Sequence, residues 1–325
     1  MKRLLIIRFS ALGDVAMLVP IVWQVAVENP NVQITMLSRE HVASLFRDMP
    51  ANVHFFGADL KGRHRGISGL NLLLREIEYQ QFDIVADMHN VLRSRWLVWR
   101  MLLANKKVAI LQKGRFKKWL LTNTRSHNAL IPTVQRYLHV LKRLGIYTSK
   151  NVVSPIIHND CTGYGVAPFA AHQGKIYPLD KMEKVVEKLS ETGETVYLFG
   201  AGEKERAVLD VWAEKYPNVC SLVGRYSMYE ELKLMRELRV MITMDSANMH
   251  LASIVGTRVV SIWGATHPNA GFLGYGQHES DCVQREDLPC RPCSIYGNKV
   301  CRYGDYRCLN ISPDRILRKI GDSKV

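Results

Sequence analysis

Residues 241–251 join a short apolar run to side chains that could bind an anion. The run ends at Asp245, and Ser246 is a favourable residue to begin a helix. The backbone N–H groups and the dipole of a helix start attract phosphate. The candidate donors are Ser246, Ala247, Asn248, Met249 and His250. We expect Asp245, which would repel phosphate, to accept backbone N–H groups and hold the turn. The alternative is a capped helix with a core histidine.

Two further loops of the second half could bind the same class of ligand. Lys175 follows Gly174, and its ammonium group could reach a phosphate as a point charge. Gly200 and Gly202 follow an apolar run and would let the backbone approach a ligand closely, while Glu203 could bind ribose hydroxyls. The alternatives are a solvated lysine and an ordinary strand-to-helix turn. Three such loops at one sheet edge favour a nucleotide site.

The loop at residues 8–14 could supply a base. It contains Gly13 but lacks the three-glycine dinucleotide fingerprint, so a nicotinamide site is not indicated. Asp14 would lie at a helix N-terminus, where the dipole favours the carboxylate that a general base needs. A plain N-cap is the alternative. Because the sequence contains no Asp-x-Asp motif, a divalent-metal clamp for a pyrophosphate is not evident, and positive protein groups would have to replace it.

Four late cysteines form a candidate structural zinc set, and packed free thiols are the alternative. They are Cys290, Cys293, Cys301 and Cys308. Another group is basic and aromatic, which suits an anionic membrane interface, a charged glycan or RNA, or else a solvated helix face. Its members are Arg93, Arg95, Arg100, Lys106, Lys107, Lys113, Arg115, Lys117 and Lys118, with Trp96, Trp99, Phe116 and Trp119.

Parallel sheets with crossover helices are the elements expected to position these residues, because short β-branched runs alternate with amphipathic stretches. The first half has expected strands at residues 4–8, 32–37, 84–86 and 108–111, with helices at 15–28, 42–49, 70–79, 92–102 and 134–144. The second has expected strands at 165–169, 195–199, 219–222, 240–243 and 258–262, with helices at 181–191, 203–216, 228–238, 247–255 and 313–320. We expect two domains, 1–155 and 156–325, facing across a cleft, with the last helix returning to the first.

Composition sets the class of protein and of partner. The 325 residues are 47% hydrophobic and 23% charged, which indicates a globular chain of about two domains. The net charge of +14 attracts polyanions without choosing among them. The N-terminal apolar run is broken by Arg8, too early for a signal peptide, and no run approaches the roughly 20 apolar residues of a membrane span. We therefore expect a cytoplasmic chain with reduced cysteines.

Ordered motifs over nearly the whole length give the chain a resemblance to glycosyltransferase family 9, the bacterial heptosyltransferases of lipopolysaccharide core assembly. The matching pieces are Ile7-Arg8 to Leu12-Gly13-Asp14, Asp87-Met88-His89 to Arg93-Ser94, Arg136-Tyr137-Leu138, Lys175-x-Tyr177-Pro178, Leu198-Phe199-Gly200, Asp245-Ser246 to His250-Leu251-Ala252, and Gly256-Thr257 to Gly264-Ala265-Thr266. Ala247-Asn248 stands where Gly-Pro is usual in the family.

The resemblance implies a GT-B fold of two Rossmann-like domains and an inverting, metal-independent transfer from an ADP-heptose donor to a lipid-anchored core acceptor. It implies that Asp14 is the base, that Lys175 and His250 bind donor phosphate, and that Glu203 or Glu205 binds ribose. The implied acceptor residues are Ser10, Gly13, Asp87, His89, Arg93 and Arg95. It also implies peripheral contact with the anionic inner membrane and no nucleic-acid partner. The alternatives are a non-catalytic polyanion- or membrane-binding module and a sugar-nucleotide epimerase of the same build.

Overall fold

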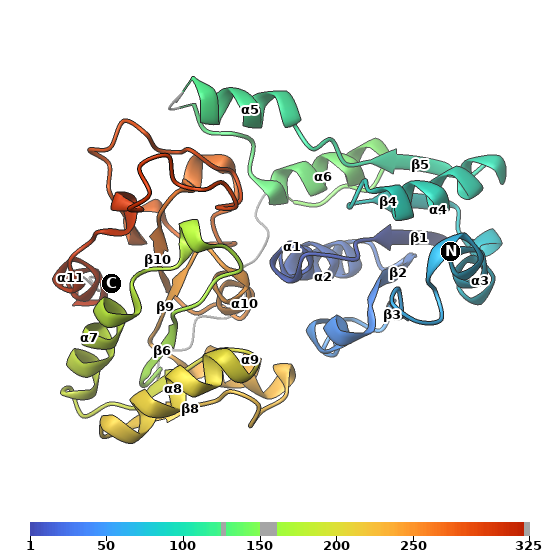
Figure 1. Cartoon of the computed structure of the whole chain (residues 1–325). Helices are drawn as coiled ribbons and strands as arrows, with labels where there is room; N and C mark the ends of the chain where they lie inside the picture. Colours follow the sequence, from blue (N-terminus) through green and yellow to red (C-terminus); the bar gives the residue numbers. More distant parts are fainter. Residues whose placement is uncertain (125–127, 150–160, 322–325) are drawn as a thin grey trace. The chain divides into compact units, whose positions relative to one another are not determined.

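The computed structural model describes residues 1–124, 128–149 and 161–321 (Figure 1). Their contacts divide the chain into two units. The described residues of Met1–Lys113 and Thr133–Val153 form the first unit, and those of Gly114–Pro132 and Ser154–Val325 form the second. Each unit is built on one parallel β-sheet, so the predicted pair of Rossmann-like domains is confirmed.

The first unit has a five-stranded sheet in the order β3-β2-β1-β4-β5. Its strands are β1 (Lys2–Ile7), β2 (Val32–Arg39), β3 (Val53–Ala58), β4 (Ile84–Asp87) and β5 (Lys107–Ile110). The central strand β1 is parallel to both neighbours, and Leu4 lies opposite Ile34 on one side and Ile84 on the other. Leu4–Ile7 is fully buried, which explains why the run is apolar without alternation: helices cover both faces of a parallel sheet.

The helices of the first unit are α1 (Leu12–Ala16), α2 (Val19–Glu28), α3 (Gly66–Glu76), α4 (Leu92–Leu103) and α6 (Thr133–Arg143). The single helix expected at 15–28 is wrong, because the chain forms two helices there. Pro20 lies in the first turn of α2 and has no N–H to continue the ladder from α1. The helix expected at 42–49 is a 3₁₀ segment, Glu40–Phe46. The strand β3 was not expected at all.

The second unit has a six-stranded sheet in the order β11-β10-β9-β6-β7-β8. Its strands are β6 (Tyr164–Ala167), β7 (Val196–Leu198), β8 (Val219–Ser221), β9 (Val240–Met244), β10 (Val259–Trp263) and β11 (Cys282–Gln284). Its helices are α5 (Arg115–Asn123), α7 (Leu179–Ser190), α8 (Glu203–Lys215), α9 (Met228–Glu237), α10 (Ala247–Ile254) and α11 (Pro313–Gly321). Every strand pairing in this sheet is parallel.

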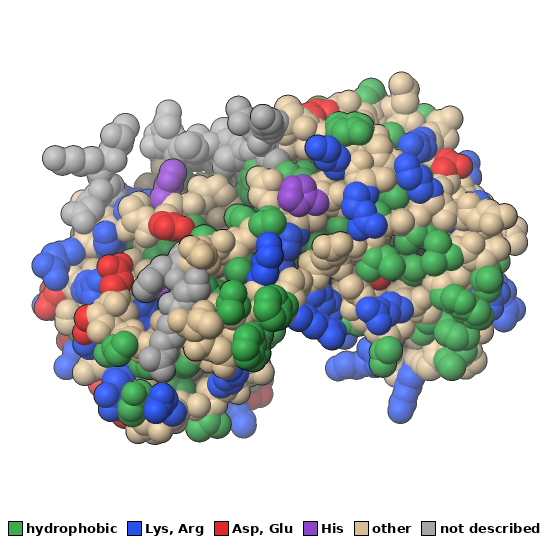
Figure 2. Space-filling view, turned by 90° about the horizontal axis from the view of Figure 1, so that it is seen from above, with side chains coloured by type: hydrophobic (Ala, Val, Ile, Leu, Met, Phe, Trp, Pro, Cys, Tyr) green, Lys and Arg blue, Asp and Glu red, His purple; other side chains and the backbone are tan. Residues whose placement is uncertain are grey.

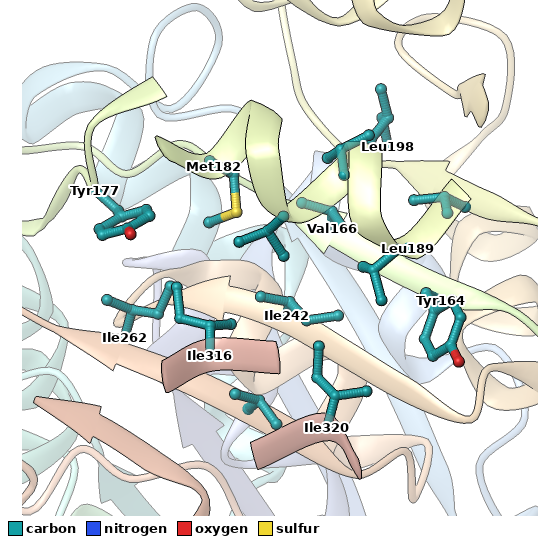
Figure 3. Close-up of a cluster of buried hydrophobic side chains, with 14 of the residues drawn as sticks. Tyr164, Val166, Tyr177, Met182, Leu189, Leu198, Ile242, Ile262, Ile316 and Ile320 are labelled. Atoms are coloured by element: carbon teal, nitrogen blue, oxygen red, sulfur yellow. The ribbon is translucent and has the colours of Figure 1, made fainter. Parts of the chain in front are cut away.

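The last helix belongs to the core of the second unit. Ile316 and Ile320 of α11 point into a cluster that also contains Met182 of α7 and Ile242 of β9 (Figure 3). The apolar face of this helix is buried against α7 and the second sheet, and the expectation that it returns to the first domain stays a prediction.

The expected domain boundary at 155 lies outside the described residues and stays a prediction. The described residues of Gly114–Pro132 group with the second unit. The amide of Leu130 donates to the carbonyl of Asn269 at 2.8 Å, and the ammonium group of Lys118 hydrogen-bonds to the hydroxyl of Tyr296 at 3.0 Å. These contacts tie the segment that carries α5 to the later part of the chain.

Among the described residues, the helices are too short or too polar for any of them to cross a membrane.

Candidate functional site

The topology of each sheet brings two of the candidate loops side by side. In the first sheet the strand order reverses between β1 and β4, where Ile7 lies opposite Asp87. In the second it reverses between β6 and β9, where Ala167 lies opposite Thr243. Ligands of doubly wound sheets bind outside the carboxyl ends of the strands at such switch points. The loops of Asp14 and His89 meet at the first, and those of Lys175 and Asp245 at the second.

Asp14 lies in the first turn of α1, as expected, and its carboxylate is held from two sides. It forms an ion pair with the Arg8 guanidinium and accepts the amide of Ala11 at 3.2 Å. The side chain of Asp14 is 24% exposed, whereas that of Arg8 is 8% exposed. A fixed carboxylate that still reaches solvent is the arrangement that a general base requires.

Arg8 is a residue of this site that sequence reasoning missed. Its guanidinium donates to the carbonyl of Met88 at 2.5 Å and lies 5.9 Å from the centre of the Tyr137 ring. Burial alone would lower the pKa of Arg8, but Tyr137 and Asp14 raise it above the ordinary value. Tyr137 in turn donates to the carbonyl of Asp14 at 3.2 Å. The available signal was an arginine directly after a fully apolar strand.

His89 and Ser10 come together, with the Nε2 atom of His89 3.3 Å from the Ser10 hydroxyl. The amide of Phe9 donates to Nδ1 at 3.4 Å, which assigns the ring proton to Nε2. Burial, with the nearby charges of Arg8 and Lys113, lowers the pKa of His89 to about 3. The ring is therefore neutral at physiological pH.

Asp87 is fully buried. Its carboxylate accepts the amides of His89 and Asn90, each at 2.9 Å, and the hydroxyl of Ser94 at 2.9 Å. Asp87 thus shapes the turn that carries His89, and its expected role in acceptor binding stays a prediction. Gly13 is also buried, while Arg93 and Arg95 are exposed on α4.

In the second unit, Lys175 and Asp245 form an ion pair at 2.8 Å. The side chains are 15% and 5% exposed, so the pair is largely shielded from water. We expected Asp245 to accept backbone N–H groups of its own turn, and its partner is Lys175 instead. A cation with a nearby carboxylate can be released to an incoming anion, because a diphosphate offers it more negative charge than one carboxylate does.

No side chain caps the start of α10. Ser246 occupies the N-cap, but its hydroxyl lies 3.1 Å from that of Thr243 and does not cap the helix. The first-turn amides begin at Ala247 and lie directly after Asp245. His250 follows and is buried. The structure therefore brings Lys175, Asp245 and the amide end of α10 together at one switch point, the setting of an anion site.

The two candidate ribose ligands, Glu203 and Glu205, differ in their contacts and in their exposure to solvent. The carboxylate of Glu205 accepts the amide of Ala201 at 2.7 Å and so closes its own loop. Glu203 is 83% exposed and contacts Arg206 at 3.1 Å. Gly202 has a φ of 79°, a conformation that glycine adopts readily. Of the two carboxylates, Glu203 is the one that a ligand could reach.

The tail after β11 supports the Lys175 loop, which sequence reasoning did not foresee. Arg291 is buried and donates to the carbonyl of Gly264 at 2.6 Å and to that of Thr266 at 2.8 Å. A Cβ atom on Gly297 would lie 2.6 Å from the side chain of Lys175. The tail is thus fastened to the end of β10 and packs directly against the Lys175 stem.

Replacing Gly297 with Ala is expected to displace Lys175. The added methyl group would overlap the Lys175 stem, and the φ of 77° at this position disfavours any side chain. We expect affinity for ADP, the donor nucleotide that the resemblance implies, to fall about tenfold and stability to fall by about 1 kcal/mol. Calorimetric titration of ADP and thermal unfolding would measure the two effects. Gly304 has a similar φ of 76° with no heavy atom within 4 Å of the added Cβ, so Gly304→Ala is the control for backbone strain alone.

The four late cysteines do not assemble into the candidate zinc site. Within the described part of the chain, no group of three or more His, Cys, Asp and Glu side chains is placed to hold a metal ion. Cys308 packs with Ala265 and Leu309 in a small apolar cluster. Burial raises the pKa of Cys308 to about 11.

A comparison with protein families matches residues 71–303 to the model of glycosyltransferase family 9 (heptosyltransferase). The chain belongs to this family. It is a glycosyltransferase, as the motifs predicted.

Individual relatives of this family-9 chain agree with that assignment. Lipopolysaccharide heptosyltransferase 3 of Escherichia coli K12 is 27% identical over 282 residues, which cover 78% of this chain and 80% of the relative. The family 9 glycosyltransferase of Veillonella parvula has a TM-score of 0.75 at 20% identity and covers 99% of this chain and 98% of its own. E. coli heptosyltransferase WaaC with ADP-2-deoxy-2-fluoro heptose has a TM-score of 0.69 at 15% identity, with coverage of 99% and 100%. The GT-B fold class is thereby confirmed.

Proposed function

We propose that this family-9 glycosyltransferase transfers a heptose from an ADP-linked donor to a lipopolysaccharide core acceptor, with inversion and without a divalent metal. The observation that carries the proposal is that each sheet places a charged side chain of the required sign at its switch point. Asp14 is there in the first unit and Lys175 in the second. The names of the relatives, and the ADP-heptose analogue named with a similar structure, support this choice of donor and acceptor.

On the acceptor side, Asp14 takes the proton of the attacking hydroxyl. Arg8 fixes the carboxylate through their ion pair. Ser10 and His89 offer a hydroxyl and a neutral imidazole beside it for orienting sugar hydroxyls. Arg93 and Arg95 provide positive charge on α4 for an anionic glycan. Asp87 and Gly13 act through the backbone turns that hold these groups.

On the donor side, the developing charge on ADP is met by protein groups. The acceptor oxygen forms a bond to the anomeric carbon as the bond to the diphosphate oxygen breaks on the opposite face, so the configuration inverts. Lys175 and the first amides of α10, with His250 behind them, stabilise the departing diphosphate. These groups supply the positive charge that a bound metal supplies elsewhere. Glu203 binds the ribose.

The test is acceptor-dependent release of nucleotide. The protein is incubated with ADP-heptose or with other nucleotide sugars, each with and without a deep-core lipopolysaccharide acceptor. We expect ADP release only when ADP-heptose and the acceptor are both present, and no loss of activity when EDTA is added. Conversion of a donor without any acceptor would support an epimerase. If no donor is turned over, the proposed reaction is wrong and the non-catalytic polyanion-binding module is favoured.

A further inference from the structure

A cavity of about 370 Å³ opens in the first unit, at the edge of the sheet where the strands begin. Arg3 of β1, Gln33 and Thr35 of β2 and His54 of β3 line it, together with the end of α3 and the segment that leads to β4. The volume falls in the range of small-molecule sites, roughly 300–1,000 Å³. The candidate base lies beyond the opposite edge of this sheet, since the extended chain from Arg3 to Arg8 spans about 16 Å.

The polar side chains of the cavity stand on the core-facing side of the sheet. Thr35 lies opposite His54, and two residues further along the strands Leu37 lies opposite Phe56. Leu37 belongs to the core cluster between this sheet and the helices α3 and α4, and Phe56 packs against that cluster. Because side chains two residues apart share a face, Thr35, His54 and Gln33 occupy core-facing positions. A parallel sheet is normally apolar at such positions, so folding stability alone does not account for these residues.

The end of α3 forms the other wall of the cavity. The helix ends at Glu76, and Glu78 has a φ of 48°, a left-handed conformation that ends the helical path and leads the chain toward β4. On the way to β4, Gln81 accepts a hydrogen bond from the Arg3 guanidinium at 2.9 Å, which holds that guanidinium beside this wall. Phe82 is buried and gives the wall an apolar part.

Three side chains of the cavity keep their hydrogen-bonding groups for a ligand. Among the residues that the structure describes, the amide of Gln33, the hydroxyl of Thr35 and the imidazole of His54 have no hydrogen-bonding or ionic partner. Gln33 and Thr35 are half-buried and His54 is exposed, so the three groups are enclosed on one side and reachable from solvent. Each of these groups can both donate and accept a hydrogen bond.

We propose that this cavity binds a neutral sugar, at a site separate from the one that carries out the transfer. The hydroxyl groups of a sugar donate and accept, which matches the free groups of Gln33, Thr35 and His54. The C–H groups of a pyranose ring are apolar and suit the aromatic rings of Phe56 and Phe82, which also line the cavity. The inference does not rest on the proposed function, because a sugar held at this edge of the sheet takes no part in the reaction.

The charges around the cavity favour a neutral ligand over an ionic one. The protein as a whole has a net charge of +14, and the face shown in Figure 2 carries more blue Lys and Arg side chains than red acidic ones. The lining of the cavity differs from that surface, because Arg3 is accompanied by Glu76 and Glu78. A phosphate would be repelled by the two carboxylates and an amine by the guanidinium. A wholly apolar ligand would leave the three free polar groups unpaired.

The experiment is an NMR titration of the full chain with the methyl glycosides of glucose, galactose and mannose, at constant pH and ionic strength. We expect at least one of them to bind with a dissociation constant of about 1 mM, which is ordinary for a ligand of this size, and to shift the ring signal of His54. The variant His54→Asn identifies that signal by its absence. Sodium phosphate and ethanolamine, as probes of the two charges, should leave the signal in place.

A variant of the cavity wall tests the hydrogen bonds. Gln33→Leu should weaken binding of the same glycoside about tenfold, because it removes one neutral hydrogen-bonding group. It should not lower the midpoint of thermal unfolding, since leucine suits a core-facing position. Thr35→Val keeps the shape of the side chain without its hydroxyl and gives the same test if Gln33→Leu folds poorly. Gln80→Leu is the matched control, because Gln80 is exposed near the cavity and is not part of its lining.

Three results would overturn the proposal. One is a wild-type chain that binds none of the three glycosides. Another is a glycoside that binds without shifting the His54 signal, or equally well to Gln33→Leu and Thr35→Val, or with the same loss in Gln80→Leu, because the sugar would then lie elsewhere. The third is a shift of the His54 signal by phosphate or ethanolamine and not by the sugars, which would make the ligand ionic. Binding of a free glycoside needs no turnover, so a failure of the proposed reaction would leave this result standing, and the reverse holds as well.

Discussion

Replacing Asp14 with Asn is expected to lower kcat by about a thousandfold while leaving ADP affinity unchanged. Asparagine keeps the shape of the side chain and can still accept the amide of Ala11, but it cannot take a proton from the acceptor. The donor groups lie on the other sheet, so they should bind ADP as before. Single-turnover measurement of transfer, with calorimetric titration of ADP, separates the two effects.

Because Asp14 forms an ion pair with Arg8, a loss of folding stability is the main alternative explanation for a fall in kcat. Arg8 is largely buried, and removing its carboxylate partner leaves a positive charge in poor contact with water. Thermal unfolding would detect that loss, and Asp14→Glu would restore the charge at a displaced position. We expect Asp14→Glu to recover most of the thermal stability but little of the turnover.

Asp59 offers a matched control in the same unit. It follows β3 at the same edge of the sheet, and its carboxylate accepts the amides of Gly62 at 2.8 Å and Arg63 at 3.0 Å. It lies away from the switch point, so Asp59→Asn should keep nearly full turnover. Full turnover in Asp14→Asn would contradict the assignment of the base, as would an equal loss in Asp59→Asn.

Sequence reasoning predicted which loops form the candidate site, but not the contacts of their side chains. Parallel strands end at one edge of a sheet, so a run of apolar residues followed by Asp245 or by the Lys175 loop is enough to place both there. The strand reversal between β6 and β9 then makes the two loops neighbours. The ion pair between them was not predictable, because the direction of each side chain depends on contacts such as the one with Gly297.

The elements that sequence reasoning missed are those whose local pattern is weak. Strand β3 contains His54, Phe55, Phe56 and Gly57 with mostly intermediate burial, which follows neither a buried run nor a clean alternation. Helix α5 has a single buried residue, Leu121, so its pattern indicates a basic patch and not a core-facing helix. Arg8 and Arg291 were missed for a different reason. Their burial is stabilised by distant carbonyl groups that only the tertiary fold supplies.

Replacing Lys175 with Met is expected to weaken ADP binding by about a hundredfold, at the upper end of what one charged hydrogen bond contributes. Methionine preserves the apolar stem that packs against Gly297 and removes the ammonium group. The loss should be this large because Asp245 is 5% exposed and would remain as an uncompensated negative charge beside the diphosphate. Lys184→Met, an exposed change of the same charge on α7, should have almost no effect.

The ion pair between Lys175 and Asp245 allows a more specific prediction for the double variant. Combining Lys175→Met with Asp245→Asn removes the repulsion together with the attraction, so ADP affinity should recover to about tenfold below the wild type. A second substitution that partly restores the affinity lost in the first is the signature of a carboxylate whose role is to hold the lysine and to neutralise it until the donor arrives. Calorimetric titration of ADP with the four proteins gives the coupling directly. If the double variant binds ADP no better than Lys175→Met, then Asp245 does not act on the diphosphate through its charge, and its role is confined to the shape of the turn before α10.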